Sequence, residues 1–448
     1  MNALDEMLKE APRARLIPTL ASSQKEQRLT SILLATMTVV RPFAEQLLRS
    51  WGVKMAKTSE LRAYTEVEFA GSDGEGKDRP DGLLYLSARK KKWAAVVEAK
   101  VGNEKIPEEQ VQRYGKSVRG RVNAVVTISN QLAPLPSHVP YSVPKRLRNG
   151  VDFYHTSWAS VLTEARLLLK DGDAKREMDP EQEYILEELA LYMEHPSSGV
   201  QRFEQMNADW RTMVLGLRSG KQFPSSSIEV ENTVGGWHQE VRDLCLILSL
   251  CIGERVKVRL PRKHQADPEL RLRSDGDRLA GSWELRCALL VPNAASDIEI
   301  VVDLKSRTVS CAMKLFAPGH RKRASAKINW LLRQLGSVTR TEEVSVRVFW
   351  PGRAAPTQES LAAIRDSPRC LEHGREGLVP TSFEVLMIPR VLGKRFAGRR
   401  TFVEDLERLV ERFYEEVGQN LRAWTPPPPP IDKSESRVGR PDEDQVRG

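Results

Sequence analysis

The sequence lacks long apolar runs and paired cysteines. No window approaches the roughly 18 uninterrupted apolar residues of a membrane-spanning helix, so we expect no such helix. The N-terminal stretch is charged and has no apolar signal core, and we therefore expect a cytoplasmic location. None of the five cysteines forms a C-x-x-C pair, which argues against a zinc site or a disulfide framework.

Two catalytic signatures are also absent. The seven histidines are scattered without an H-x-x-H or H-E-x-x-H pattern, which excludes a zinc peptidase at the level of its motif. No G-x-x-x-x-G-K-[ST] occurs, so we do not expect the chain to hydrolyse nucleotides with a P-loop. A helicase or ATPase activity would have to come from a partner protein.

The composition is that of a soluble globular protein with a basic excess. Its 448 residues suffice for two or three domains, each with its own core. Lysine and arginine number 69 against 60 aspartates and glutamates, a net charge of +9 that suits an anionic partner. Because this charge is spread along the chain, it does not identify the partner.

The clearest chemical pattern lies in the stretch 79–114. The apolar run 93–97 predicts a buried strand, after which Glu98 and Lys100 are two residues apart and point to the same face. Asp81 opens a second apolar run, and a hairpin between the two runs places it beside Glu98. Two neighbouring carboxylates repel each other, and a divalent cation relieves that repulsion. The alternative, an ordinary salt bridge on a solvated sheet, conflicts with the apolar run.

This ordered set resembles the motif of the PD-(D/E)XK nuclease superfamily. Asp81 and the triplet 98–100 match its acidic and lysine positions. Gln110 and Tyr114 resemble the Q-x-x-x-Y element of RecB-like members. Residues from about 20 to 170 follow the pattern, with elements expected in the order α-β-β-β-α-β. The resemblance implies the α/β class, with a restriction-endonuclease-like mixed sheet flanked by helices.

The resemblance also implies a role for each site residue. Asp81, Glu98 and the backbone carbonyl of Ala99 would bind Mg²⁺ or Mn²⁺, since hard cations take oxygen ligands. Lys100 would hold the attacking water or offset negative charge on the phosphate. The Q-x-x-x-Y pair would orient these groups from the following helix, without binding the metal.

Glu26 has two interpretations. Residues 24–51 predict one long helix, or two helices broken near Pro42, with Ser22 or Ser23 as the N-cap. Glu26 then stands where it completes a capping box. Related nucleases often carry a glutamate on the helix before the first strand, so Glu26 is also a candidate fourth active-site acid.

We expect three regions along the chain. The nuclease-like domain covers 1–195, and an α+β accessory domain, whose function is nucleic-acid or partner binding, covers 196–424. Its first part reads as helical over 200–250 and as several strands over 254–315. Residues 425–448 form a Pro-rich, charged tail that we expect to be disordered.

A basic helix in the second region is a candidate nucleic-acid contact. Arg321, Arg323 and Lys327 would grip phosphates and lead the substrate to the nuclease-like domain. The ordinary interpretation of such a stretch is a solvated charged face, with apolar residues on the opposite side.

Two functions from different classes follow. The first is a Mg²⁺-dependent phosphodiesterase, for which DNA is favoured over RNA as substrate while both stay open, with a role in defence against foreign DNA by analogy. The second is a catalytically inactive nucleic-acid-binding or scaffold protein on the same fold. The complete set of two acids and a lysine favours the first function, because a site that had lost its activity would have no reason to keep all three residues. A homodimer and a partner ATPase or helicase are both compatible with it.

Overall fold

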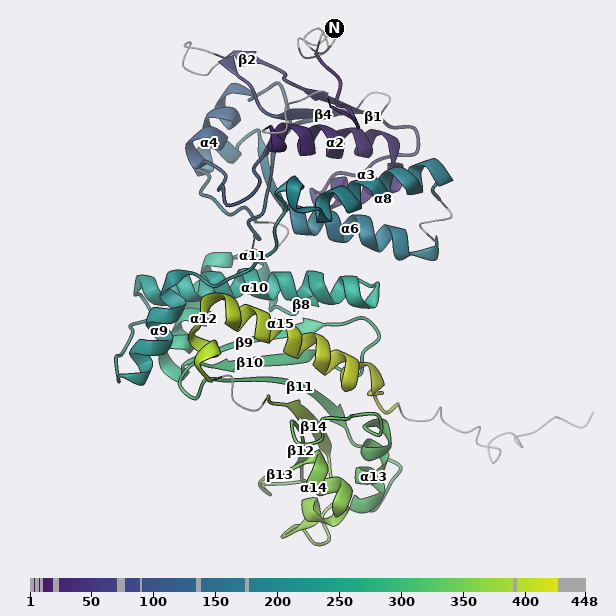
Figure 1. Ribbon diagram of the computed structural model, residues 1–448, viewed down its shortest axis with the longest axis vertical. Helices are drawn as coiled ribbons and strands as arrows, with labels where there is room; N and C mark the ends of the chain where they lie inside the picture. The colour runs from purple at the N-terminus through teal and green to yellow at the C-terminus, as the bar shows by residue number, and fades with distance from the viewer. Residues whose placement is uncertain are drawn as a thin grey trace, which may run out of the picture.

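The computed structural model of the chain contains two large β-sheets, each covered by helices (Figure 1). The mixed α/β class expected from the sequence is therefore confirmed. The structure describes residues 4, 8, 11–18, 24–70, 77–88, 91–133, 138–173, 177–389 and 393–425. The predicted caps Ser22 and Ser23, and the predicted tail beyond Thr425, lie outside these residues.

The first large sheet holds five strands in the order β1-β4-β5-β6-β7. Their bounds are β1 Glu60–Thr65, β4 Gly82–Ala88, β5 Lys91–Ala99, β6 Ala124–Ser129 and β7 Asp152–Ser157. β1, β4 and β5 pair antiparallel, whereas β5, β6 and β7 are parallel, which makes the mixed sheet that the sequence predicts. β6 is buried at every residue because helices cover both faces of the sheet, which explains its continuous apolar run.

Helices separate the two faces of this sheet. α2, α3, α6 and α8 pack on one face, and α4 packs on the other. The bounds are α2 Lys25–Val39, α3 Arg41–Ser50, α4 Glu108–Ser117, α5 Lys145–Arg148, α6 Trp158–Lys170 and α8 Pro180–Glu194. Val97 and Ala99 pack against the larger helical layer, whereas Val96 packs toward α4. Side chains alternate along a strand, so Glu98 faces α4 as well.

The first helices and strand end where local backbone chemistry dictates. α2 ends at Val39, and Pro42 stands in the first turn of α3, where its missing N–H is not needed. The helix is thus broken at the predicted place. β1 ends at Thr65 because Glu66 has a φ of +60°, a left-handed conformation that interrupts extended chain. The next segment, β2 Phe69–Ala70, pairs instead with β3 Lys77–Asp78.

The second large sheet has seven strands in the order β13-β12-β14-β11-β10-β9-β8, all antiparallel. The bounds are β8 Lys257–Val258, β9 Glu284–Leu290, β10 Ile298–Asp303, β11 Thr308–Phe316, β12 Val344–Phe349, β13 Thr357–Ser360 and β14 Ser382–Met387. The helices are α9 Ala208–Arg218, α10 Ile228–Ile252, α11 Arg262–Ala266, α12 Pro268–Ser282, α13 Ala324–Gln334, α14 Leu361–Asp366 and α15 Arg399–Glu416. This is the α+β region expected to follow the first sheet.

Helices occupy part of the region in which the sequence predicts only strands. α11 and α12 fill residues 262–282, between β8 and β9. Asp267 caps α12 by accepting a hydrogen bond from the Leu270 N–H at 2.9 Å, and Pro268 opens its first turn. An Asp-Pro pair before a helix is a signal that strand periodicity alone overlooks.

α10 lies between the two halves of the molecule (Figure 1). It contacts α6 of the first half and α9, α12 and α15 of the second. It is apolar on more than one side, as expected of a helix with neighbours all around it. Among the described residues no helix is long and apolar enough to cross a membrane.

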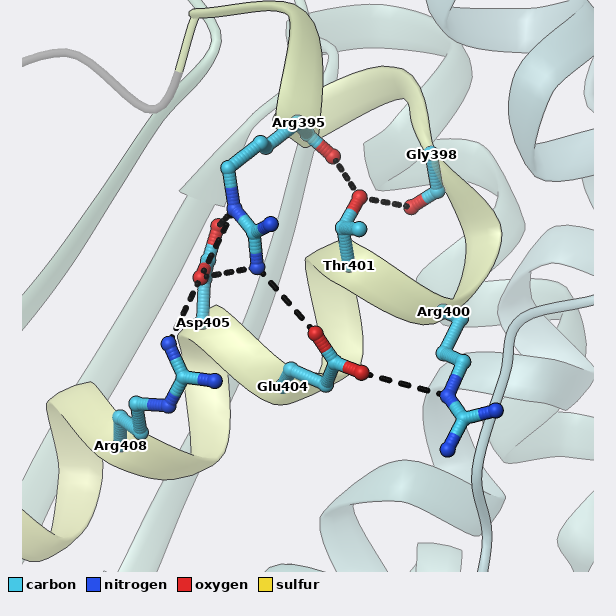
Figure 2. A network of polar contacts seen from close by, with 7 residues as sticks. All are labelled: Arg395, Gly398, Arg400, Thr401, Glu404, Asp405 and Arg408. Carbon is cyan, nitrogen blue, oxygen red and sulfur yellow. Dashed lines mark hydrogen bonds and ion pairs between the residues drawn. The ribbon is translucent and has the colours of Figure 1, made fainter.

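A charged network fixes the start of α15 (Figure 2). The Arg395 guanidinium pairs with Asp405 at 2.9 Å and with Glu404 at 3.2 Å. The Thr401 hydroxyl donates to the Arg395 carbonyl at 2.6 Å. These bonds hold the segment before α15 against its first turns, where Gly398 provides no side-chain N-cap.

Candidate active site

The register of the β4–β5 hairpin brings Asp81 next to the end of β5. Gly82 pairs with Val97, and the Asp81 Oδ2 accepts a hydrogen bond from the Ala99 N–H at 2.8 Å. A Cβ at position 82 would collide with the buried Leu34 side chain on α2, so glycine favours the close approach of the two elements. The Pro-Asp-Gly sequence therefore lets α2 approach β4 closely at the point where the acid is placed.

Glu98 is the most buried acid of the site. Its side chain is 2% exposed and its Oε1 lies 3.2 Å from the Lys100 Nζ. Burial, together with the nearby negative charge of Asp81, raises the pKa of Glu98 to about 7, against the opposing effect of Lys100. Burial likewise raises the pKa of Asp81 to about 6, although the Ala99 N–H and Lys100 lower it. The negative charge of Asp81 thus opposes the ionisation of Glu98.

Lys100 stands between two acids. Its Nζ lies 3.0 Å from Glu26 Oε2 and 3.2 Å from Glu98 Oε1. Burial alone lowers the pKa of Lys100, but the charges of Glu98 and Glu26 outweigh it and raise the pKa above its usual value. The indole N–H of Trp158 donates to the Lys100 carbonyl at 2.9 Å, which fixes the backbone below the ammonium group.

Glu26 is not a helix cap. Gln24 is the N-cap of α2, and it makes no side-chain capping bond. Glu26 instead bonds Lys100 and accepts a second hydrogen bond from the Val101 N–H at 3.3 Å. The capping-box interpretation is therefore wrong, and Glu26 lies where the alternative interpretation puts a fourth acid.

Gln110 and Tyr114 reach the site from α4. The Gln110 Nε2 donates to Glu98 Oε1 at 2.9 Å and to the Tyr114 hydroxyl at 2.7 Å. The Tyr114 hydroxyl donates to the Arg79 carbonyl at 3.4 Å. Burial raises the pKa of Tyr114, as does the charge of Glu98, so the phenol stays protonated. The two residues thus form the supporting layer that their spacing of four predicts.

The sequence analysis missed a second acid on the same segment. Asp78, 6% exposed, pairs with the Arg113 Nε at 2.7 Å and accepts a hydrogen bond from the Ser117 hydroxyl. Arg113 and Ser117 are four apart on α4 and face the segment that leads to Asp81. Their side chains anchor that segment to the helix.

Two further polar residues continue the row that begins at Glu98. Thr127 is its partner on β6 and His155 is the partner of Thr127 on β7. The Thr127 Oγ1 lies 2.9 Å from His155 Nδ1, and His155 Nε2 lies 2.8 Å from the Gln131 carbonyl. Burial lowers the pKa of His155 to about 4, so the ring is neutral and its Nε2–H donates to the carbonyl. These residues become neighbours through the pairing of three strands, which cannot be predicted from the sequence.

The loop after Lys100 is tied to the segment that leads into the second half of the chain. The Gly102 N–H donates to the Gly199 carbonyl at 2.8 Å. The Asn130 Nδ2 donates to the Gly102 carbonyl at 3.0 Å and to the Gly199 carbonyl at 2.8 Å, and its Oδ1 accepts from the Gln201 N–H at 3.0 Å. We call this group the Asn130 junction. Gly199 has a φ of +77°, and a Cβ there would lie 3.0 Å from Val101 Cβ.

The donor set fits a hard divalent cation. Within the described residues, no three His, Cys, Asp or Glu side chains gather as a metal site on their own. Asp81 and Glu98 offer two carboxylates whose pKa values are raised mainly by burial, and the Ala99 carbonyl is the third oxygen that the resemblance implies. Mg²⁺ typically takes one or two carboxylates and fills its other positions with water and substrate oxygens. The residues present therefore match that preference.

The basic residues of the second region do not form one exposed surface. Lys327 on α13 is 8% exposed, and its Nζ donates to the Pro380 carbonyl at 2.9 Å. Burial lowers the pKa of Lys327. Arg321 donates to the Ala326 carbonyl at 3.0 Å, and Arg323 is exposed just before the helix. The expectation that Lys327 grips phosphate is therefore corrected, because its ammonium group serves a buried carbonyl.

The comparisons with known proteins assign no family. No family model matches the chain, and no curated protein or solved structure matches it either. The site is interpreted from its own geometry and from the resemblance of its motif.

Proposed function

We propose that the protein is a metal-dependent nuclease that hydrolyses phosphodiester bonds of DNA. The observation that carries the proposal is the convergence of Glu26, Asp81 and Glu98 on Lys100 at the end of a buried strand. Three acids against one lysine leave an excess of negative charge in a buried place, and a divalent cation would compensate it. Mg²⁺ or Mn²⁺ is the proposed cofactor.

Different residues of the site would bind the metal ion and donate hydrogen bonds to the reacting groups. When bound, Mg²⁺ lowers the pKa of a water molecule and neutralises charge on phosphate oxygens. Asp81, Glu98 and the Ala99 carbonyl would hold it. Lys100, whose raised pKa keeps it protonated, can donate to the attacking water or to a phosphate oxygen on which negative charge grows. Glu26 aims the ammonium group by a direct bond at 3.0 Å.

Gln110 and Tyr114 would act through Glu98. The hydrogen bond from Gln110 fixes the orientation of the Glu98 carboxylate, and the protonated Tyr114 phenol helps to fix Gln110 in turn. Bonds of this kind tune a metal-binding carboxylate, and their loss typically reduces activity by a factor of about 10 to 100.

Substitution of Lys100 tests the proposal. Wild type and Lys100→Ala are incubated with supercoiled DNA, linear DNA and RNA, with Mg²⁺ and with EDTA. We expect Mg²⁺-dependent cleavage of DNA by wild type and a loss on the order of 10² in Lys100→Ala. Mn²⁺ calorimetry should show that the variant still binds metal. Lys116→Ala, an exposed lysine on α4, is the matched control and should cleave like wild type.

Three outcomes would contradict parts of the proposal. Equal cleavage by wild type and Lys100→Ala would place the activity elsewhere. Cleavage of RNA alone would correct the substrate. DNA binding without cleavage would favour the inactive nucleic-acid-binding alternative. The proposed role in defence against foreign DNA rests on analogy, and infection of cells that express wild type or Lys100→Ala tests it separately.

A further inference from the structure

A cavity lies at the junction of the two halves of the chain. It has a volume of about 550 Å³, within the range of small-molecule sites. Its walls come from α3, α6, α10, the end of β7 and the segment around β8. It is thus built from both halves, and of the residues described for the site around Glu98 and Lys100 only His155, at the end of the row through Thr127, also lines it.

The cavity carries an uncompensated positive charge. Arg49, Arg242 and Lys257 line it, and the described residues give none of the three an ion pair or a side-chain hydrogen bond. Arg255 also lines it but pairs with Glu164, which is the only acid among the lining residues. Among the described residues, these three positive charges line the space without a direct ion pair.

Arg242 is the cavity cation whose charge is most strongly affected by burial. It projects from the buried helix α10, and burial lowers its pKa while the neighbouring Arg255 lowers it further, against the effects of Cys245, Glu164 and Asp243. A partly buried guanidinium without a partner is destabilising unless something else supplies an anion. Arginine forms paired hydrogen bonds with phosphate and carboxylate oxygens, which makes Arg242 a suitable anchor for such a ligand.

Polar groups and apolar walls complete the cavity. Ser157 and Ser160 line it at the first turn of α6, where the positive end of the helix dipole also favours an anion. The amides of Gln46 and Gln265 can pair with the edge of a base. The aliphatic part of the wall, which can cover the faces of a base, consists of Leu47, Leu132, Leu167, Leu246, Val256 and Val258.

We infer that this cavity binds a nucleotide, with its phosphate on Arg242 and its base between the aliphatic side chains. Three cations match a phosphate group better than a single carboxylate, and the volume leaves room for a sugar and a base. The inference does not depend on the proposed nuclease activity, because it uses other residues and needs no metal.

Calorimetry in EDTA tests the inference. The probes are the four ribonucleoside monophosphates, the matching nucleosides and inorganic phosphate. We expect at least one monophosphate to bind at least tenfold more tightly than its nucleoside and than inorganic phosphate. Arg242→Gln should weaken that binding by at least tenfold, and the double variant Arg49→Gln, Lys257→Gln should weaken it too. The double variant changes exposed residues, so it keeps the test valid if Arg242→Gln folds poorly.

Two controls locate the binding. Arg211→Gln changes an exposed, unpaired arginine on α9, and Lys100→Ala changes the other site; both should bind like wild type. The inference is overturned if no monophosphate binds at millimolar concentration, or if the nucleoside or inorganic phosphate binds equally well. It is also overturned if the cavity variants bind like wild type or if Lys100→Ala alone abolishes binding.

Discussion

Replacement of Glu98 by glutamine should stabilise the metal-free protein at the same time as it abolishes metal binding. The pKa of Glu98 is about 7 in the folded protein against an ordinary value of 4.5. Each unit of pKa is worth about 1.4 kcal/mol, so ionising Glu98 costs the folded state roughly 3 kcal/mol more than the unfolded state. Glutamine removes the charge and keeps an oxygen that can accept the hydrogen bond from Gln110.

The sign of the effect depends on pH. A raised carboxyl pKa means that the folded state holds its proton when the unfolded state has lost it. The penalty is therefore absent below about pH 4.5, grows as the pH rises to about 7, and is complete at pH 8. Glu98→Gln should match wild type in stability near pH 4.5 and exceed it by up to about 3 kcal/mol at pH 8.

Urea unfolding in EDTA at the two pH values measures this difference. Calorimetry with Mn²⁺ supplies the second readout, because metal binding requires ionised carboxylates. The affinity of wild type for Mn²⁺ should rise between pH 6 and pH 8, and Glu98→Gln should not bind at either pH. Glu109→Gln, an exposed acid on α4, serves as the control and should change neither quantity. A less stable Glu98→Gln at pH 8, or one that retains wild-type Mn²⁺ affinity, would refute the reasoning.

Three other predictions follow from the same contacts. Gln110→Ala should keep the fold and reduce cleavage about tenfold, less than Lys100→Ala, because it removes only the bond that orients Glu98; an equal loss in kcat would contradict this order. Asp78→Asn should lower the free energy of unfolding by about 1–2 kcal/mol, since its partner Arg113 is half exposed; urea unfolding would show no change if the pair is unimportant. Lys327→Met should leave the affinity for DNA and its salt dependence unchanged in a filter-binding assay. A weaker affinity would support the hypothesis that Lys327 contacts phosphates.

Local patterns in the sequence predict the first sheet and the place of its acids well. The apolar runs before Glu98 and after Asp81 define β5 and β4, and the alternation of side chains sets which residues share a face. What local pattern does not determine is long-range contact. The bond between Glu26 and Lys100 joins residues 74 positions apart, so the sequence leaves the cap and the active-site acid equally open.

The second half of the chain shows the same limit. The basic residues around Lys327 predict an exposed charged face. Whether a residue of α13 is buried depends on its neighbours in the fold, and the segment at Pro380 covers Lys327. α12 begins at an Asp-Pro signal within a stretch whose surroundings alternate like strands. Thr127 and His155 become neighbours of Glu98 only through strand pairing. The misses at Lys327, Thr127 and His155 come from tertiary packing, whereas α12 begins at a local signal that strand periodicity overlooks.

The Asn130 junction changes how the chain can be divided. The predicted boundary at residue 195 precedes Gly199 and Gln201, which bond Asn130 from the far side of that boundary. A protein cut there would lose these bonds, and of the Asn130 junction only the Gly102 bond to Asn130 would remain. The smallest piece that retains the geometry around Lys100 therefore extends to at least Gln201. The same bonds tie residues 199–201 to the loop that follows Lys100, so a displacement of that segment would be passed on to the loop beside the candidate site.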